Sequence, residues 1–181
     1  MDEPKDVYER HGSLVWATVY RILGNHVEAL DCCQDIFSEV LRGSQTRQVR
    51  DWPAFLKWLA TRRAIDRLRR RRVDAARFSQ DGDISGVAAV ALSVDAGVIS
   101  DELVARLKLE LARLPEQQAE AFWLLSVEEL SYEEISKQLG VEMNHVGVLV
   151  YRARQRLRVW LADLKAAGPG ARSNSKFGGR D

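Results

Sequence analysis

The pattern of apolar and polar positions predicts helices along most of the chain, and the clearest is the segment from Trp52 to Arg72. Apolar residues recur there at helical spacing over about 21 residues, or roughly 30 Å of helix. Asp51 is placed to cap its open N–H groups, and Pro53 falls in the first turn, where a missing N–H costs little. The first half is apolar on every side, whereas the second half carries an arginine-rich face. We therefore expect the first half to be buried and the second to face a partner.

Two helices are predicted before this segment, over 5–23 and 26–42, with a Gly24-Asn25 turn between them. The second of these helices has an apolar stripe formed by Leu30, Cys33, Phe37, Val40 and Leu41. Its outer face is acidic and amide-bearing, and comprises Asp31, Gln34, Asp35 and Glu39. A polar connector, 44–51, leads into the next helix. Three helices with short connections predict a compact helical domain over 5–73.

The amino-acid composition changes after residue 73, and this change predicts a second domain. Residues 74–100 mix Gly, Asp and Ser with a mildly apolar run, and we expect a flexible linker with weak local structure. Helical spacing resumes over 101–165, and the Gly/Ser-rich tail 166–181 is expected to be disordered. The predicted fold is all-α, with two small helical domains.

The second domain contains the pattern of a helix-turn-helix. Ser131 and Glu134 form the Ser-x-x-Glu capping box that starts a helix, and Gly140 supplies a tight turn before a final helix over about 143–164. The outer flank of this final helix is expected to hold the groups that would meet DNA, namely Asn144, His145, Val148, Leu149, Arg152 and Arg156.

Charge is strongly segregated although the formal net charge is only +1. Residues 57–72 carry Lys57 and seven arginines against one acid, Asp66, while 101–134 carry nine acids against three basic residues. A near-neutral total therefore does not argue against a polyanionic partner. A solvated basic face is the alternative interpretation of 57–72.

Other classes of function find little support in the sequence. The adjacent cysteines Cys32 and Cys33 form neither a disulfide framework nor a zinc pattern, and no cofactor is expected. His11, His26 and His145 are scattered, without a nucleophile–base pair or phosphate loop, so no enzyme is expected. The chain lacks a run of about 18 apolar residues and a signal-peptide pattern, so a cytoplasmic location is expected.

Several motifs in series resemble one known family. They are DCCQDIF at 31–37, WLATRRAIDRLRRRR at 58–72, LARLPEQQAEAFWL at 111–124, and then LSYEEISKQLGV and VYRARQRLR. In this order they resemble the extracytoplasmic-function sigma factors of RNA polymerase, of the sigma-70 family. The resemblance covers about residues 5–162. It implies sigma region 2 at 5–73 and sigma region 4 at 101–165.

The resemblance also implies roles for the faces described above. Asp31, Gln34, Asp35 and Glu39 would dock the clamp helices of the largest polymerase subunit. The face formed by Arg62, Arg63, Asp66, Arg67 and Arg70 would read the −10 promoter element, and connector 44–51 would receive a flipped base. The linker would thread toward the polymerase channels. The helix-turn-helix would bind the −35 element and the flap of the second-largest subunit. Family members are also commonly restrained by an anti-sigma factor.

The final helix departs from the family pattern. Where the family usually has a hydroxyl residue and then a basic, small, basic run, this chain has His145 and then Gly147, Val148 and Leu149. Two expected positive side chains are missing, so the −35 contact is expected to be weaker, to have an unusual sequence, or to be carried by Asn144, His145, Arg152 and Arg156. Leu149 could still contact a thymine methyl group.

Two other functions remain open from the sequence. The chain could be a two-domain helix-turn-helix regulator that binds DNA without joining polymerase, or a sigma-like decoy that has lost DNA binding. Charge reversal at Asp31 and Asp35 separates the first of these from a sigma factor, because only a sigma factor would lose polymerase binding.

Overall fold

The computed structural model describes residues 4–43, 49–80 and 96–166, and all seven elements in these ranges are helices. The all-α prediction is confirmed. The connector residues 44–48, the middle of the expected linker at 81–95 and the tail from residue 167 lie outside the described residues.

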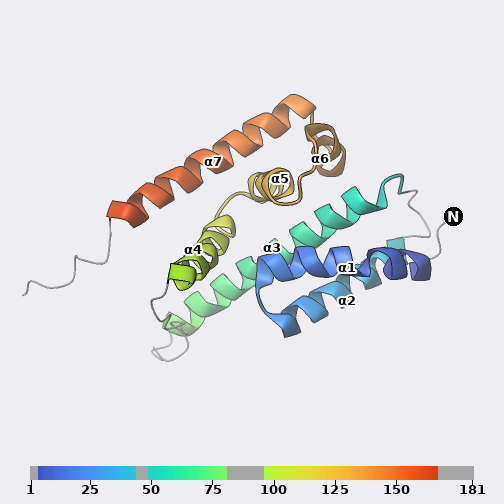
Figure 1. Ribbon diagram of the computed structural model, residues 1–181, viewed down its shortest axis with the longest axis horizontal. Coiled ribbons are helices and arrows are strands. Elements are labelled where there is room, and N and C mark those ends of the chain that lie inside the picture. Colours follow the sequence, from blue (N-terminus) through green and yellow to red (C-terminus); the bar gives the residue numbers. More distant parts are fainter. Residues whose placement is uncertain (1–3, 44–48, 81–95, 167–181) are drawn as a thin grey trace, which may run out of the picture.

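The first three helices form one layer of the molecule (Figure 1). They are α1 (Pro4–Leu23), α2 (His26–Gly43) and α3 (Trp52–Gln80). Gly24 has a φ of 68° at the turn between α1 and α2, a value that suits glycine. The Asn25 side chain accepts a hydrogen bond from the Glu28 N–H, and Asp51 Oδ1 accepts one from the Ala54 N–H at 3.0 Å. Both caps therefore follow from local sequence.

The buried face of α2 is rotated from the predicted stripe. Ala29, Cys32, Ile36, Phe37 and Val40 are its buried residues, whereas Leu30 and Leu41 are 46% and 52% exposed. The prediction was wrong for these two leucines. Neighbouring positions on a helix differ by about 100° in direction, so a stripe that is read one residue out of register still contains apolar residues.

The remaining four helices form the second layer (Figure 1). They are α4 (Ala96–Leu111), α5 (Glu116–Ser126), α6 (Tyr132–Leu139) and α7 (Met143–Ala166). The Ser131 side chain accepts from the Glu134 N–H and the Glu134 carboxylate accepts from the Ser131 N–H, so the predicted capping box is present. Gly140 has a φ of 64° and ends α6 in the left-handed conformation. The predicted helix-turn-helix is thus formed by α6 and α7.

The expected linker is shorter than the sequence suggested. The helix that was predicted to end at residue 72 continues to Gln80, and α4 begins at Ala96 rather than at residue 101. The prediction of weak local structure over 74–100 is therefore wrong at both ends of that range, because residues 74–80 and 96–100 are helical. Residues of high helix propensity, such as Arg and Ala, favour the continuation of α3 to Gln80.

The two layers share a hydrophobic core. Leu111, Leu114 and Trp123 belong to the same buried cluster as Val15 of α1 and Leu56 of α3. A second cluster links Ala54 at the start of α3 with α5, α6 and α7. The helix-turn-helix domain therefore packs directly on α3, an arrangement that the sequence did not predict.

Candidate nucleic-acid interface

The arginine face of α3 is bound on one side by acids of α2. Arg63 Nη2 lies 2.6 Å from Glu39 Oε2, and Arg67 Nη2 lies 2.6 Å from Asp35 Oδ2. Arg67 also donates to the carbonyl of Glu28. The acidic and basic faces that the sequence suggested as separate sites therefore meet across one groove.

This groove lies between α2 and α3. The residues that line it are Cys32, Asp35, Glu39, Arg42, Arg63, Asp66, Arg67 and Arg70. Arg70 is exposed at its edge. The ion pairs are partly solvated, since Asp35 is 71% and Glu39 is 44% exposed. Solvated pairs of this kind contribute about 0–1 kcal/mol, so an incoming phosphate could replace either carboxylate at little cost.

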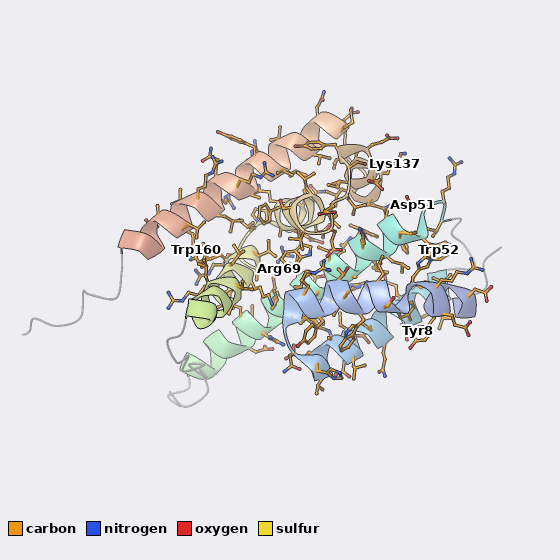
Figure 2. The ribbon with its side chains drawn as sticks, viewed as in Figure 1. Tyr8, Asp51, Trp52, Arg69, Lys137 and Trp160 are labelled. Atoms are coloured by element: carbon orange, nitrogen blue, oxygen red, sulfur yellow. The ribbon has the colours of Figure 1, made fainter. Side chains whose placement is uncertain are left out.

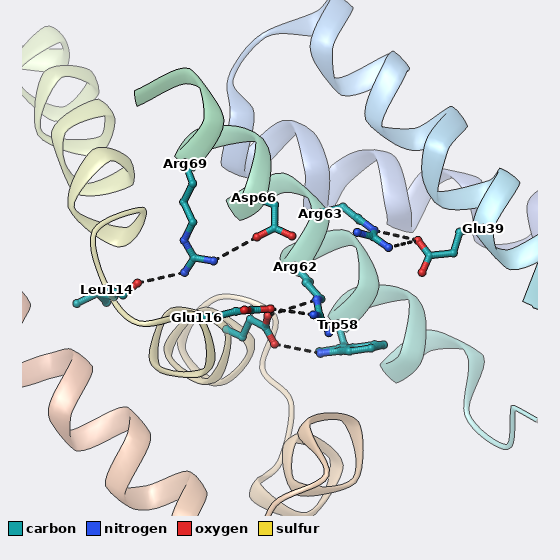
Figure 3. Close-up of polar contacts among 9 residues, drawn as sticks. Glu39, Trp58, Arg62, Arg63, Asp66, Arg69, Leu114 and Glu116 are labelled. Atoms are coloured by element: carbon teal, nitrogen blue, oxygen red, sulfur yellow. Dashed lines mark hydrogen bonds and ion pairs between the residues drawn. The ribbon is translucent and has the colours of Figure 1, made fainter. Parts of the chain in front are cut away.

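The other side of α3 is occupied by the C-terminal domain (Figure 3). Arg62 pairs with Glu116 at 2.9 Å, and its guanidinium lies 5.7 Å from the centroid of the Trp58 ring. Trp58 Nε1 donates to Glu120 Oε2 at 3.2 Å. Further along α3, Arg69 donates to the Leu114 carbonyl and to Asp66. Arg69 was not among the predicted residues, and no feature of the arginine run distinguishes it from its neighbours.

Glu120 is an unusual member of this contact. It is 3% exposed, and its Oε1 atom has no hydrogen-bond partner among the described residues. Burial raises the pKa of Glu120 to about 7, although the Trp58 hydrogen bond and the Arg62 charge oppose the rise. A carboxyl group that titrates near neutral pH therefore lies between the two domains.

A second groove lies where α6 approaches the start of α3. Its lining includes Arg50, Asp51, Phe55 and Trp58 on one side and Lys137 on the other. Figure 2 shows Lys137 and Asp51 on the same side of the molecule. Half-buried aromatic rings beside cationic groups are the chemistry that stacks and holds unpaired bases. The groove opens beside the connector, whose residues 44–48 are not described.

The predicted −35 residues divide into two groups. Asn144, His145, Arg152 and Arg156 are exposed on α7, as a DNA contact requires. Leu149 is only 4% exposed and packs in the cluster with Val146 and Val150, so its assignment to the outer flank was wrong. Residues 146, 149, 150 and 153 lie on one side of a helix, and α5 and α6 cover that side. Tyr151, which the sequence analysis did not select, is 62% exposed.

Comparison with known proteins identifies both halves of the chain. Residues 7–73 match the family described as Sigma-70 region 2, and residues 105–157 match Sigma-70, region 4. The ECF RNA polymerase sigma factor SigK of Mycobacterium sp. strain KMS is 31% identical over 139 residues, covering 76% of this chain and 72% of SigK. The chain belongs to the ECF sigma factors of RNA polymerase.

Other members of the family are also similar to this sigma factor. SigE of Mycolicibacterium smegmatis is 32% identical over 158 residues, covering 87% of this chain and 61% of SigE. SigW of Bacillus subtilis is 27% identical over 169 residues, covering 88% of this chain and 89% of SigW. The chain thus matches less than two thirds of the length of SigE.

Among solved structures, the sigma factor RpoE, which was crystallised with the anti-sigma factor NepR from Bartonella quintana, has a similar fold. Its TM-score is 0.53 at 23% identity, covering 87% of this chain and 96% of RpoE. The matches to regions 2 and 4 and the relative SigK confirm the family assignment from the sequence. Members of this family bind RNA polymerase and promoter DNA.

The two cysteines of this sigma factor are poor candidates for thiolate chemistry. Burial raises the pKa of Cys32 to about 12 and that of Cys33 to about 11, so both thiols stay protonated at neutral pH. Within 4–43, 49–80 and 96–166, no three His, Cys, Asp or Glu side chains are grouped as metal ligands. None of the described helices is long and apolar enough to cross a membrane.

Proposed function

We propose that this sigma factor recruits core RNA polymerase to specific promoters through three surfaces. The outer face of α2 docks the clamp helices of the largest subunit, the arginine face of α3 contacts the −10 element, and α7 contacts the −35 element. The observation that carries the proposal is the presence of regions 2 and 4 in one chain, each with an exposed charged face. The polymerase supplies the catalysis, so this chain acts without an active site of its own.

The proposed polymerase surface centres on Asp31 and Gln34. Both are exposed on α2, and the exposed side chains of Val27, Leu30 and Leu41 give the same helix an apolar component. A surface that combines apolar side chains with acids suits a protein partner better than DNA, because phosphates repel acids. Asp35 and Glu39 lie closer to α3, where they also hold Arg67 and Arg63.

The proposed −10 surface combines charge with aromatic rings. Arg63, Arg67 and Arg70 supply cations for phosphates along the α2–α3 groove. Phe55 and Trp58 line the neighbouring groove and could stack on bases of the opened strand. Once a duplex is breached, turning an unpaired base outward costs little, so a short patch of this kind is sufficient.

The proposed −35 surface is the exposed flank of α7. Asn144 and His145 lie in the first turn of the helix, which enters the major groove in helix-turn-helix proteins. Arg152 and Arg156 are exposed further along the helix, where they would meet phosphates. We infer that this domain also meets the flap of the second-largest subunit.

Because transcription takes place in the cytoplasm, we place the protein there. RpoE, which has a similar fold, was solved with an anti-sigma factor, and a partner of that class would fit this chain.

Run-off transcription tests this function. Core polymerase with the purified full chain should give discrete transcripts from a genomic template library that core polymerase alone does not give. Products no more abundant than those of the core enzyme alone would overturn the proposal. Mapping the start sites of the transcripts would then yield both promoter elements.

A further inference from the structure

Glu128 lies in the turn between α5 and α6 and is held by two helices of the other domain. Its side chain is buried although it is acidic, with 4% of the residue exposed. Glu128 Oε2 accepts a hydrogen bond from Thr18 Oγ1 at 3.0 Å, and Oε1 accepts one from Arg21 Nη1 at 2.6 Å. Lys57 Nζ donates to the Glu128 main-chain carbonyl at 2.7 Å. One turn residue of region 4 is thus bound by α1 and α3 of region 2.

The carboxylate is also oriented from within its own domain. Trp123 Nε1 of α5 lies 3.3 Å from Glu128 Oε1. A buried carboxylate is costly unless it is paired and hydrogen-bonded, and both the charge of Arg21 and the Thr18 hydroxyl come from α1. The burial of Glu128 is therefore favourable only while the two domains are in contact. If they separated, water would solvate the carboxylate instead.

The closed arrangement conflicts with binding both promoter elements at once. The −10 and −35 elements are about 25 base pairs apart, or about 85 Å at 3.4 Å per base pair. Helix α6, which directly precedes the first turn of α7, packs on α3, and the 29 residues of α3 measure only about 44 Å. The surfaces proposed for the two elements are thus too close together, so that region 4 must leave α3 before both can bind.

The contact between α3 and α5 also contains a buried group that favours separation of the two domains. Glu120 is buried, and its Oε1 atom has no hydrogen bond among the described residues, with Arg62 Nε no closer than 4.0 Å; burial raises its pKa to about 7. An unsatisfied buried polar atom costs free energy that is recovered when water reaches it. The same contact occupies Trp58 and Arg62, which belong to the proposed −10 surface.

We propose that Glu128 is an interdomain latch that holds the free chain closed, with region 4 covering part of the −10 surface, until polymerase or promoter binding releases it. The inference rests on the proposed function for its biological role, but the latch itself is a property of the free chain. The latch comprises Glu128 with Thr18, Arg21 and Lys57.

Energy transfer within the full chain tests the latch. Donor and acceptor fluorophores would be attached through noncanonical amino acids at Ser38 on α2 and Val159 on α7, which are both exposed, so that Cys32 and Cys33 stay untouched. Arg21→Ala removes the cationic partner and leaves a buried charge unpaired in the closed state. We expect it to raise the ratio of open to closed molecules at least about tenfold, seen as lower transfer efficiency.

Two further variants complete the experiment. Glu128→Ala should also open the chain. Arg21 is half exposed, so Arg21→Ala keeps the test available if Glu128→Ala does not fold. The matched control is Glu133→Ala in α6, which removes a carboxylate that pairs with Lys137 of the same helix. It should leave transfer efficiency unchanged.

Equal transfer efficiency in the wild type, Arg21→Ala and Glu133→Ala, with native helical content by circular dichroism, would overturn the latch. The measurement needs neither polymerase nor promoter. A chain that opens in Arg21→Ala but supports no transcription would therefore retain the latch and overturn the proposed function. An Arg21→Ala chain that supports transcription but keeps the wild-type transfer efficiency would overturn the latch and retain the proposed function.

Discussion

Arg67 of α3 and Asp35 of α2 form an ion pair with 2.6 Å between Nη2 and Oδ2, so a residue proposed for promoter DNA is paired with one proposed for polymerase. Because Asp35 is 71% exposed, the pair is weak and can exchange for another partner. Binding at either surface would therefore alter the charge that the other presents. The variants that separate the two surfaces must avoid this pair.

Asp31 provides a clean test of the polymerase surface. It is exposed on α2 and lies outside the α2–α3 groove. Asp31→Lys should weaken binding to core polymerase at least about tenfold, because it places a cation where the acidic face docks, while binding of the free chain to DNA is retained. Binding to fluorescently labelled core enzyme measures the effect. Asp35→Lys should alter both activities, since it also removes the partner of Arg67.

Glu133→Lys is the control for Asp31→Lys, because it makes the same charge change at an exposed site on α6. A core affinity of Asp31→Lys equal to that of the control would remove α2 from the polymerase interface. A regulator that binds DNA without joining polymerase would give this result.

Arg70 tests the −10 surface. It is exposed at the edge of the α2–α3 groove, so a phosphate can reach it without breaking an existing pair with Asp35 or Glu39. Arg70→Ala should weaken promoter binding by the holoenzyme and reduce the slope of log affinity against log salt concentration by about 1. Arg113→Ala, at an exposed arginine before α5, should leave this slope unchanged. A salt dependence that is identical in both variants would place Arg70 outside the interface.

Glu120 should make the contact between the domains depend on pH. Trp58, Arg62 and Asp66 of α3 and Glu116 of α5 act on it, and burial is the largest cause of its raised pKa. The closed state binds the proton more tightly than an open state in which Glu120 is hydrated. Closure is therefore favoured at low pH and is weakened as the pH rises from about 4.5 through about 7. Energy transfer between the labelled domains, measured from pH 5 to pH 8, should fall along this range.

Glu120→Gln mimics the neutral carboxyl group at every pH. It should keep the chain closed and flatten the pH profile between pH 5 and pH 8, whereas Glu133→Gln should retain the wild-type profile. If Glu120→Gln kept the full pH dependence, another group would have to carry the titration.

Leu149 and His145 separate stability from DNA contact on α7. Leu149→Ala should lower the free energy of unfolding by about 2–5 kcal/mol, because it leaves a cavity in the cluster of α5, α6 and α7. His145→Ala should leave stability within about 0.5 kcal/mol, since His145 is exposed. It should instead weaken binding to the −35 element. Urea unfolding and binding to a mapped promoter fragment measure the two effects. A stable Leu149→Ala variant with reduced DNA affinity would support the original assignment of Leu149.

Local features of the sequence determined the elements and several of their ends. Asp51 and Ser131 cap helices through hydrogen bonds to N–H groups three residues away, and Gly140 adopts the left-handed conformation that its lack of a Cβ permits. These interactions span a few residues, so the chain specifies them wherever the segment lies. The series of motifs likewise identified the family and the all-α fold.

Only the tertiary structure decided which faces meet. The burial of Leu149 and the exposure of Leu30 depend on which side of a helix its neighbours cover, and a helical periodicity leaves that uncertain by about one residue. Glu128 appeared in the sequence as one of nine acids in an acidic segment. Its contacts with Thr18 and Arg21 join residues 110 and 107 positions apart, and no local rule encodes such a pairing. The sequence thus determined the helices and the family, whereas packing between the domains decided which charges are paired, buried or left for a partner.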